Sequence, residues 1–535
     1  MGLTKNTLKH TAIYSSATLL GRLVSFFMLP FYAHIFRTEG YGLIGIIDAS
    51  LGFLSILFAS GFHVAITSSY HEEEGENKRG VISTAIWLVW GLGLLAIPLP
   101  MLFSPFISSF LLGDAQYYKL ICVALITFAI DVGGQSAGTF LVIRQRSMLY
   151  SVVGLVKLFV GLGLNIWLVI ILNVGLIGIF ITSLINAVIS SIIFHWIAIR
   201  NNGGAYDHRI CRKLLKFQLP LMPGDFISYA SRQADWFLVR FLINLQAVGV
   251  LEMAYKFPPL LNLIITHPFA LSWRTKSMEI AQQEDAPEIM GRMFTKYLYI
   301  TGFGALLMSV AIKEVLEILT PVEFWGAVRI AKIEIITTVL AGATIYMMFG
   351  LLYSKETKTI AVIRSVCAVI KIGLSFLFIT MWGLLGAACS ALITEIIILA
   401  WISWNSQRSY PIRIEYAKIA IIILSAVGIG FAVSYVDYTN FWPAIYLRTH
   451  ALNDVRLFLS STPLGAWKDG KLIGIFQARE TQVVSLAFNL LFAMSYLFLL
   501  PVVQPGFAQS ALRRFNFIGM IKLRHHLKAA DKTVR

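Results

Sequence analysis

The sequence has little charge for its length, and most of the charge that it has is positive. Only 13% of its 535 residues are Asp, Glu, Lys or Arg, whereas 57% are hydrophobic. Soluble domains carry about 25% charged residues. A soluble core has no use for this much apolar surface, so the composition excludes an ordinary soluble enzyme and predicts a chain that faces lipid.

Cysteine is also scarce. The four cysteines, Cys122, Cys211, Cys367 and Cys389, are scattered along the chain. Three of them lie in apolar segments. Such a distribution is not typical of a disulfide framework or a metal site, and we expect neither a metal nor a cofactor. No cleavable signal sequence is visible, so the first apolar stretch is predicted to be a spanning helix.

Long apolar segments, in contrast, are abundant. They predict an all-α polytopic membrane protein with about fourteen transmembrane helices. With the N-terminus in the cytoplasm, the short outer loops hold only Arg37 and Arg329, while the cytoplasmic stretches hold most of the loop Lys and Arg. The positive-inside rule therefore predicts that both termini are cytoplasmic. The excess of 44 basic over 28 acidic residues is mostly this topological signal, and we expect no nucleic-acid partner.

Two short motifs return at nearly one offset. Gly175–Gly178 (Gly-Leu-Ile-Gly) comes back 208 residues later as Gly383–Gly386, and Thr38–Leu43 has a weaker echo, 207 residues on, at Leu245–Val250. These landmarks predict a duplicated unit of about 200 residues. Each copy holds six spans, an even number, so we expect two parallel repeats that form two lobes related by an axis along the membrane normal.

The repeat divides the chain into parts. We predict an N-lobe with spans 1–6 over residues 1–204 and a C-lobe with spans 7–12 over residues 205–410. Two extra helices, spans 13 and 14, follow within residues 411–503. A polar, extracytoplasmic insertion over residues 436–482 separates them, and a basic cytoplasmic tail covers residues 504–535.

Ionisable residues within the predicted spans are numerous, and each costs several kcal/mol in hydrocarbon unless it faces water or a partner. The cations outnumber the anions. The cations are Arg22, Lys157, Arg232, Arg240, Lys256, Arg364 and Lys371, and the anions are Asp48, Asp131, Asp235, Glu252 and Glu395. A net cationic cavity suits an anionic substrate, because desolvated Arg pairs well with phosphate oxygens.

We therefore predict a substrate cavity and a set of coupling groups. The predicted cavity residues are Arg22, Arg232, Asp235, Lys157, Arg364 and Lys371. The candidates for proton or ion coupling are Asp131, Asp235 and Glu395. Two simpler interpretations stay open: Arg232 and Asp235, three residues apart on one helix, can neutralise each other, and Arg240 and Lys256, near span ends, can reach the membrane surface.

Several motifs occur in an order that resembles a known family. They are Thr11–Ser16 running into Gly21–Ser25, then Arg37–Gly42, Leu141–Arg146, Phe217–Pro223 and Ala234–Leu238. Over residues 8–410 the sequence resembles the polysaccharide flippase branch of the multidrug/oligosaccharidyl-lipid/polysaccharide (MOP) exporter superfamily, the branch that includes O-antigen flippases.

The resemblance implies a transporter rather than an enzyme. It implies two six-helix lobes in a V, which open alternately to either face and carry an undecaprenyl-diphosphate-linked saccharide across the bacterial inner membrane. The product is a surface polysaccharide such as a lipopolysaccharide or exopolysaccharide. The implied partners are the lipid-linked saccharide, membrane lipids and a polysaccharide polymerase or export machinery.

Other functions remain open. A lipid II flippase and a multidrug or cation antiporter share this fold, although an antiporter would favour an acidic cavity, the reverse of the observed bias. A membrane glycosyltransferase or polymerase would use polar residues of the 436–482 insertion. Its candidates are His450, Asp454, Arg456 and Asp469, but no pair of them has a diagnostic spacing.

Overall fold

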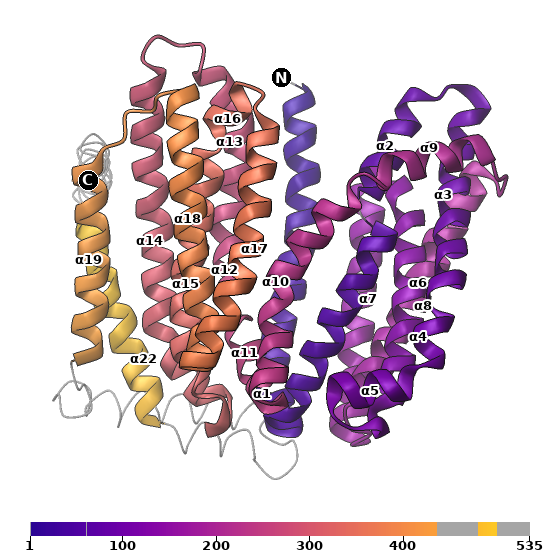
Figure 1. Ribbon diagram of the computed structural model, residues 1–535, viewed down its shortest axis with the longest axis horizontal. Helices are drawn as coiled ribbons and strands as arrows, with labels where there is room; N and C mark the ends of the chain where they lie inside the picture. Colours follow the sequence, from indigo (N-terminus) through magenta and orange to yellow (C-terminus); the bar gives the residue numbers. More distant parts are fainter. Residues whose placement is uncertain (1, 60, 436–479, 500–535) are drawn as a thin grey trace, which may run out of the picture. The chain divides into compact units, whose positions relative to one another are not determined.

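The computed structural model describes residues 2–59, 61–435 and 480–499, and within these ranges every regular element is helical (Figure 1). The helices of the first part are α1 (Gly2–Ala59), α2 (Phe62–Glu72), α3 (Gly75–Ala96), α4 (Pro98–Leu102), α5 (Ser104–Leu112), η1 (Ala115–Tyr117), α6 (Tyr118–Ile143), α7 (Ser147–Asn165), η2 (Ile166–Ile171), α8 (Ile177–Asn202), α9 (His208–Gln218), α10 (Met222–Leu242) and α11 (Leu245–Ala254).

The later helices complete the described chain. They are α12 (Pro258–Leu261), η3 (Asn262–Thr266), α13 (His267–Ile280), α14 (Ala286–Leu319), η4 (Val322–Phe324), α15 (Ala327–Met347), α16 (Phe349–Tyr353), α17 (Thr357–Trp382), α18 (Leu384–Ser409), α19 (Tyr416–Tyr435), α22 (Glu480–Ala493) and η6 (Met494–Leu499). The predicted insertion lies outside the described residues except for its last three, with which α22 begins. The predicted basic tail lies outside them as well.

The chain is a multi-pass membrane protein. Ten helices of the described part are long and apolar enough to cross a membrane. Two further long helices, α10 with 21 residues and α14 with 34, carry several ionisable side chains. The total of fourteen spans stays a prediction.

Local sequence explains where the long helices break. Arg37, at φ 56°, interrupts α1 between the segments predicted as the first two spans. Pro220 lies in the turn between α9 and α10, and Pro258 begins α12 after the break that follows α11. Proline removes a backbone donor and clashes with the preceding turn, so the helix ends or kinks at these positions.

The helices group into two compact units. The first unit contains Met1–Lys256, Leu319–Ile333 and Ala361–Ile397, and the second contains Phe257–Ile318, Glu334–Ile360 and Ile398–Arg535. All predicted cavity and coupling residues belong to the first unit. The predicted boundary between the N-lobe and the C-lobe, at residues 204/205, is not tested by this division into units and stays a prediction.

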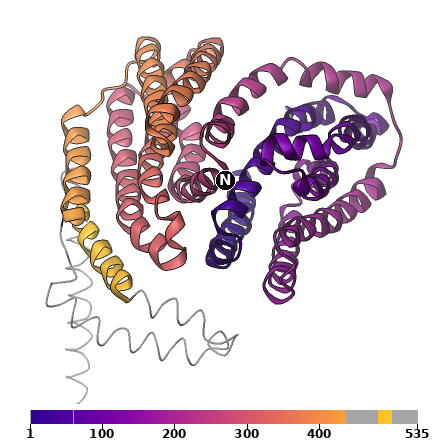
Figure 2. The same ribbon diagram turned by 60° about the horizontal axis from the view of Figure 1, so that its bottom comes forward.

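Within the first unit, α6 and α8 lie side by side (Figure 1). Small residues permit this approach: a methyl group on Gly134 would lie 3.0 Å from the Cα atom of Ser191. An apolar core continues from these helices to α2, α3 and α9, and includes Ile66, Ile82 and Leu214. In the second unit, α19 and α22 are neighbours (Figure 2).

Two pairs of elements repeat at a single offset. The three-residue η4 begins 207 residues after the three-residue η1, at 322 against 115. The 26-residue α18 also begins 207 residues after the 26-residue α8, at 384 against 177. This offset equals that of the Thr38–Leu43 echo. The element bounds are consistent with the predicted duplication, but the two-repeat layout and its symmetry axis stay predictions.

Candidate functional site

The most buried charge of the first unit is Asp235 on α10, whose side chain is 0% exposed. The Lys371 ammonium on α17 lies 2.8 Å from its Oδ2 atom. The Ser375 hydroxyl donates to Oδ1 at 2.7 Å, and the Tyr255 hydroxyl donates to Oδ2 at 3.2 Å. Lys371 also donates to the carbonyl oxygen of Ser231 at 2.8 Å. The carboxylate thus has a cation and two hydroxyl donors, as a buried charge requires.

This arrangement resolves one of the open interpretations. Asp235 pairs with Lys371, 136 residues away, and not with Arg232 on its own helix. The pair joins α10 to α17, and a hydrogen bond of 2.7 Å between the Ser375 and Ser390 hydroxyls extends it to α18. The interpretation that Arg232 and Asp235 neutralise each other is therefore wrong. Lys371 and Ser375 are four positions apart, about one helical turn, so both face Asp235 from one side of α17.

A second ion pair joins α6 to α7. Lys157 lies 3.3 Å from Asp131, and each side chain is 33% exposed. Gln135, one turn after Asp131, donates to the other carboxylate oxygen at 2.6 Å. The two predicted residues therefore meet in a half-buried pair, less shielded from water than the pair at Asp235.

The third lysine of the predicted spans is paired as well. Lys256 lies 3.1 Å from Glu252, which is one helical turn earlier in the chain. Glu252 is on α11, and Lys256 follows the end of this helix. The indole of Trp236 donates to the same carboxylate at 2.9 Å. Lys157, Lys256 and Lys371, the three lysines among the cations named from the sequence, therefore each have a carboxylate partner.

The arginines differ from the lysines in their surroundings. Arg232 is exposed, with its guanidinium 5.6 Å from the ring centroid of Tyr229, and no ion pair joins it to another described residue. Arg364 on α17 is also exposed. Arg240 donates to the carbonyl oxygen of Leu111 at 2.7 Å, and its reach to the membrane surface stays a prediction.

Two other predicted residues complete the set. Arg22 lies on α1, but its side chain is outside the described part of the structure. Glu395 is half-buried on α18. No metal-binding group of three or more His, Cys, Asp or Glu occurs among the described residues. No sequence pattern singles out the partners Tyr255, Ser375 and Ser390, because hydroxyl residues are common in apolar helices.

The two echoed motifs meet in space. A methyl group on Gly42 of α1 would overlap the carbonyl oxygen of Leu245, and one on Gly249 of α11 would overlap the carbonyl oxygen of Thr38. Leu245 and Gly249 each lie 207 residues after Thr38 and Gly42. The contact is thus reciprocal: each motif places its glycine against the backbone of the other, as at a two-fold axis.

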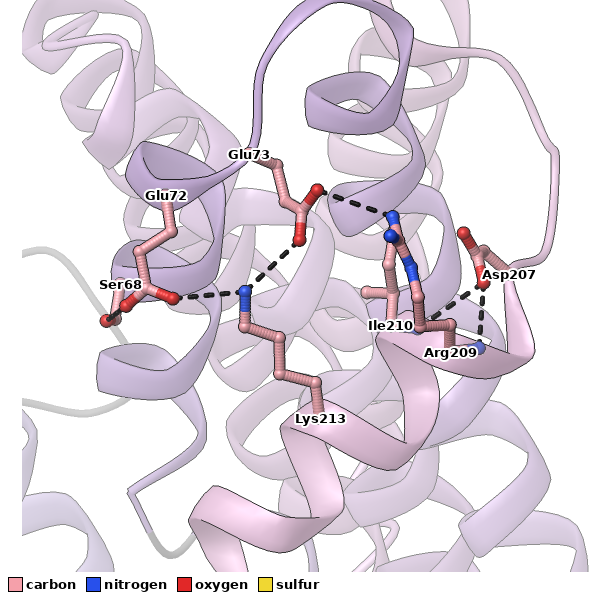
Figure 3. Close-up of polar contacts among 7 residues, drawn as sticks. All are labelled: Ser68, Glu72, Glu73, Asp207, Arg209, Ile210 and Lys213. Atoms are coloured by element: carbon pink, nitrogen blue, oxygen red, sulfur yellow. Dashed lines mark hydrogen bonds and ion pairs between the residues drawn. The ribbon is translucent and has the colours of Figure 1, made fainter.

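A cluster of exposed charges lies at a different place, between α2 and the connector helix α9. Lys213 lies 3.0 Å from Glu72 and 3.1 Å from Glu73, and Arg209 lies 3.4 Å from Glu73 (Figure 3). Asp207 caps α9 by accepting from the backbone of Arg209 at 2.7 Å. These pairs attach the start of α9 to the end of α2.

Hydrogen bonding shifts both titrating partners of this cluster. The hydroxyl of Ser68 and then the ammonium of Lys213 lower the pKa of Glu72. The carboxylates of Glu72 and Glu73 raise the pKa of Lys213. Both shifts favour the charged forms, so the cluster is held together over a wide range around neutral pH.

Comparisons with known proteins give one family match and one fold. Residues 7–273, about half of the chain, match a family model described as polysaccharide biosynthesis protein. The chain is similar to the lipid II flippase MurJ in its inward closed conformation, with a TM-score of 0.65, 15% identity and coverage of 91% of this chain and 99% of that one.

A transporter of another kind shares the fold. An inward-facing multidrug resistance MATE family transporter of the MOP superfamily gives a TM-score of 0.58 at 14% identity, and covers 73% of this chain and 95% of its own. No curated protein sequence matches the chain. At these identities the two structures establish the fold.

Proposed function

We propose a transport function from the premise that this chain belongs to the polysaccharide biosynthesis protein family. The chain moves a saccharide linked to undecaprenyl diphosphate across the bacterial inner membrane, for the synthesis of a surface polysaccharide. The physical task is to carry a diphosphate and a polar glycan through about 30 Å of hydrocarbon. A water-filled cavity with fixed cations serves the head group while the lipid tail stays in the bilayer.

One observation carries this proposal: Arg232, inside a predicted span, forms no ion pair with a described residue. Lys157, Lys256 and Lys371 each have a carboxylate partner, whereas Arg232 is exposed and joined to no described carboxylate. Guanidinium groups bind phosphate oxygens in bidentate fashion and are less strongly hydrated than ammonium groups. Arg232, with Arg22 and Arg364, is therefore assigned to the diphosphate of the substrate.

The ion pairs are assigned to coupling and to positioning. Asp131, Asp235 and Glu395 are the candidates for binding the proton or ion that drives transport. Protonation of Asp235 would release Lys371, and an approaching diphosphate would attract the same ammonium. Lys157 and Lys371 can therefore bind the substrate only when their ion pairs with Asp131 and Asp235 are broken.

Alternating access needs a contact between the two halves that forms on one side of the membrane. The reciprocal contact of Gly42 and Gly249 supports such a closure between the predicted lobes. With both termini in the cytoplasm, this contact lies on the outer side. A cysteine at position 205 that reacts with an external reagent in intact cells would contradict that orientation.

The alternatives differ in what they bind. The named neighbours are a lipid II flippase and a multidrug transporter, and both activities are runners-up for this chain. A polysaccharide polymerase or export complex is the proposed downstream partner. The exposed Arg232, which forms no ion pair with a described residue, favours an anionic lipid over a cationic drug.

A binding comparison in detergent separates these functions. Purified protein is heated with a polyprenyl-diphosphate saccharide, with lipid II, with polyprenyl monophosphate or with a lipophilic cation. The proposal expects the largest rise in unfolding temperature with the diphosphate saccharide, because bound ligand stabilises the native state. Stabilisation by the cation alone would support the antiporter, and stronger stabilisation by lipid II would support the lipid II flippase.

A further inference from the structure

An apolar cavity lies in the first unit, between the second half of α1 and the helices α4, α5 and α6. Its volume is about 180 Å³, and its wall includes Ile46 and Leu54 of α1, Leu111 of α5 and Ala124 of α6. Of the predicted substrate and coupling residues whose side chains are described, none belongs to this wall. The cavity is therefore a feature that the proposed substrate site does not explain.

A bend in the third predicted span opens this space. Pro98 begins α4, Pro105 lies in the first turn of α5, and between these helices the backbone at Phe103 has φ −89° and ψ 12°. Proline removes a backbone donor and clashes with the preceding turn, so a helix bends there. Pro100, within the bend, is itself part of the cavity wall. The break in the helix thus leaves room between this span and α1.

The wall offers no free polar group. Ser50 is the one polar side chain among the described residues that line the cavity, and its hydroxyl already donates to the carbonyl oxygen of Ile46 at 2.7 Å. A water molecule in a cavity needs two to four polar partners, and a sugar needs such partners as well. An empty space of this size would cost its lining the contacts of close packing. The cavity therefore suits a hydrocarbon chain.

Hydrocarbon is available beside the cavity. The side chains along the bend and α5 are between 52% and 76% exposed and apolar, as expected of a surface that faces lipid: Leu102, Phe103, Phe106 and Phe110. Pro100 and Ile107, which belong to the wall, are only half-buried. The cavity thus lies at a lipid-facing surface and is not sealed from it.

A guanidinium lies at the edge of the same cavity. Arg240 of α10 donates from Nε to the carbonyl oxygen of the wall residue Leu111 at 2.7 Å. A methyl group on Gly113 would lie 2.5 Å from its Nη2 atom, so the guanidinium spans the end of α5. It has five N–H donors, and no carboxylate of the described residues forms an ion pair with it. It therefore keeps donors for an anion next to an apolar space.

We propose that the cavity binds a phospholipid of the surrounding bilayer, with one acyl chain in the cavity and the phosphate on Arg240. Guanidinium groups bind phosphate oxygens in bidentate fashion. Arg240 lies two residues before the end of α10, and a long basic side chain near the end of a spanning helix reaches the depth of the lipid head groups. The site does not depend on the identity of the transported substrate.

The bound lipid borders the contact between α1 and α11. Ile46, a wall residue, lies one helical turn after Gly42, which touches the backbone of Leu245. An acyl chain in the cavity would hold the bent α4 and α5 against this part of α1. The lipid thereby supports the helix that carries the reciprocal glycine contact.

Photolabelling of the purified full-length protein in nanodiscs tests the cavity. The nanodiscs contain phosphatidylcholine and a small share of phosphatidylglycerol that carries a diazirine on one acyl chain, and labelled peptides are identified by mass spectrometry. We expect labelling to concentrate on residues 107–125. Ala124→Phe fills the cavity and should lose most of this labelling, whereas Val156→Phe, at an exposed position of α7 outside the wall, should keep it. Labelling spread evenly over the lipid-facing helices, or unchanged in Ala124→Phe, overturns the site.

Competition by unlabelled lipids identifies the occupant and does not require Ala124→Phe to fold. Phosphatidylglycerol should displace the label from the native protein, and about tenfold more of it should be needed in Arg240→Gln, because a hydrogen bond between charged groups is lost. Diacylglycerol, which has no phosphate, should compete equally in both proteins. Equal competition by phosphatidylglycerol in both would remove Arg240 from the site. Displacement by polyprenyl phosphate but not by phosphatidylglycerol would assign the cavity to a polyprenyl chain and overturn the phospholipid.

Discussion

At the scale of single residues, lysine and arginine occupy different positions in the membrane helices. Lys157, Lys256 and Lys371 each lie within 3.3 Å of a carboxylate. A compact ammonium is strongly hydrated and needs a compensating charge when it is buried. Arg232 instead lies against an aromatic ring, which leaves its guanidinium able to bind a phosphate.

Replacing Arg232 should therefore impair transport without unfolding the protein. We expect Arg232→Ala to lower the flipping rate by about 10- to 100-fold, because hydrogen bonds to charged groups contribute about 1.5–3 kcal/mol. Arg232→Lys should retain part of the activity. Arg408→Ala is the matched control, since Arg408 also lies over a ring, that of Trp404, at 4.8 Å. Equal rates for the two Ala variants would remove Arg232 from the substrate site.

The buried pair gives a second prediction. Removing one partner of a buried ion pair costs about 3–5 kcal/mol, because the other charge is left alone. Asp235→Asn and Lys371→Met should each lower thermal stability strongly, and the double variant should recover most of it. Asp131→Asn should cost less, since that pair is one-third exposed. A double variant no more stable than the singles would show that the pair does not act as a unit.

The sequence predicts which residues are unusual here but not how they combine. Asp235 and Lys371 both stand out as ionisable residues inside apolar segments, and both are in the predicted cavity set. Their pairing across 136 residues depends on how α10 packs against α17, which no local pattern encodes.

At the scale of helices, close packing at glycine holds α1 against α11. At Gly42 and Gly249 each helix lies directly against backbone atoms of the other. The sequence echo predicted that these motifs are equivalent. It did not predict that they touch, because equivalence within a repeat says nothing about distance.

Adding one methyl group should open this contact. In Gly42→Ala or Gly249→Ala the new Cβ atom would overlap a carbonyl oxygen, and the helices must separate. We expect slower flipping and faster reaction of a cysteine at position 43, in a background without other cysteines, with an impermeant thiol reagent. Gly91→Ala is the control, because a methyl group there meets nothing within 4 Å. If all three variants behave alike, the contact at Gly42 and Gly249 does not close the space between the predicted lobes.

The connector helix α9 should respond to pH in a defined direction. The pKa of Glu72 is lowered, so its contribution to the stability of the contact between α2 and α9 is present above the usual pKa of a glutamate and is lost as pH falls. The pKa of Lys213 is raised, so its contribution to the same contact is lost only in alkali. We expect the α9 amides to exchange faster, relative to those of α8, below about pH 4. Lys213→Met should produce this change at neutral pH, whereas Arg212→Met should not. An α9 that exchanges equally in both variants would show that the charged cluster does not hold it.

At the scale of the whole molecule, composition and apolar segments were enough to predict an all-α membrane fold. That prediction is confirmed by the described helices and by the likeness to two transporters. The number of spans is harder to predict, because α10 and α14 are long but carry several charges. Hydropathy alone cannot separate a charged spanning helix from a surface helix.

The central claim is that the chain moves a lipid-linked saccharide across a membrane, and transport in liposomes tests it most directly. Purified protein is reconstituted with a fluorescent undecaprenyl-diphosphate saccharide, and the fraction exposed on the outer leaflet is followed over time. The account predicts faster equilibration than in protein-free liposomes, with most of the gain lost in Arg232→Ala and kept in Arg408→Ala. Equilibration no faster than in protein-free liposomes, by a protein that is folded and inserted, would contradict it.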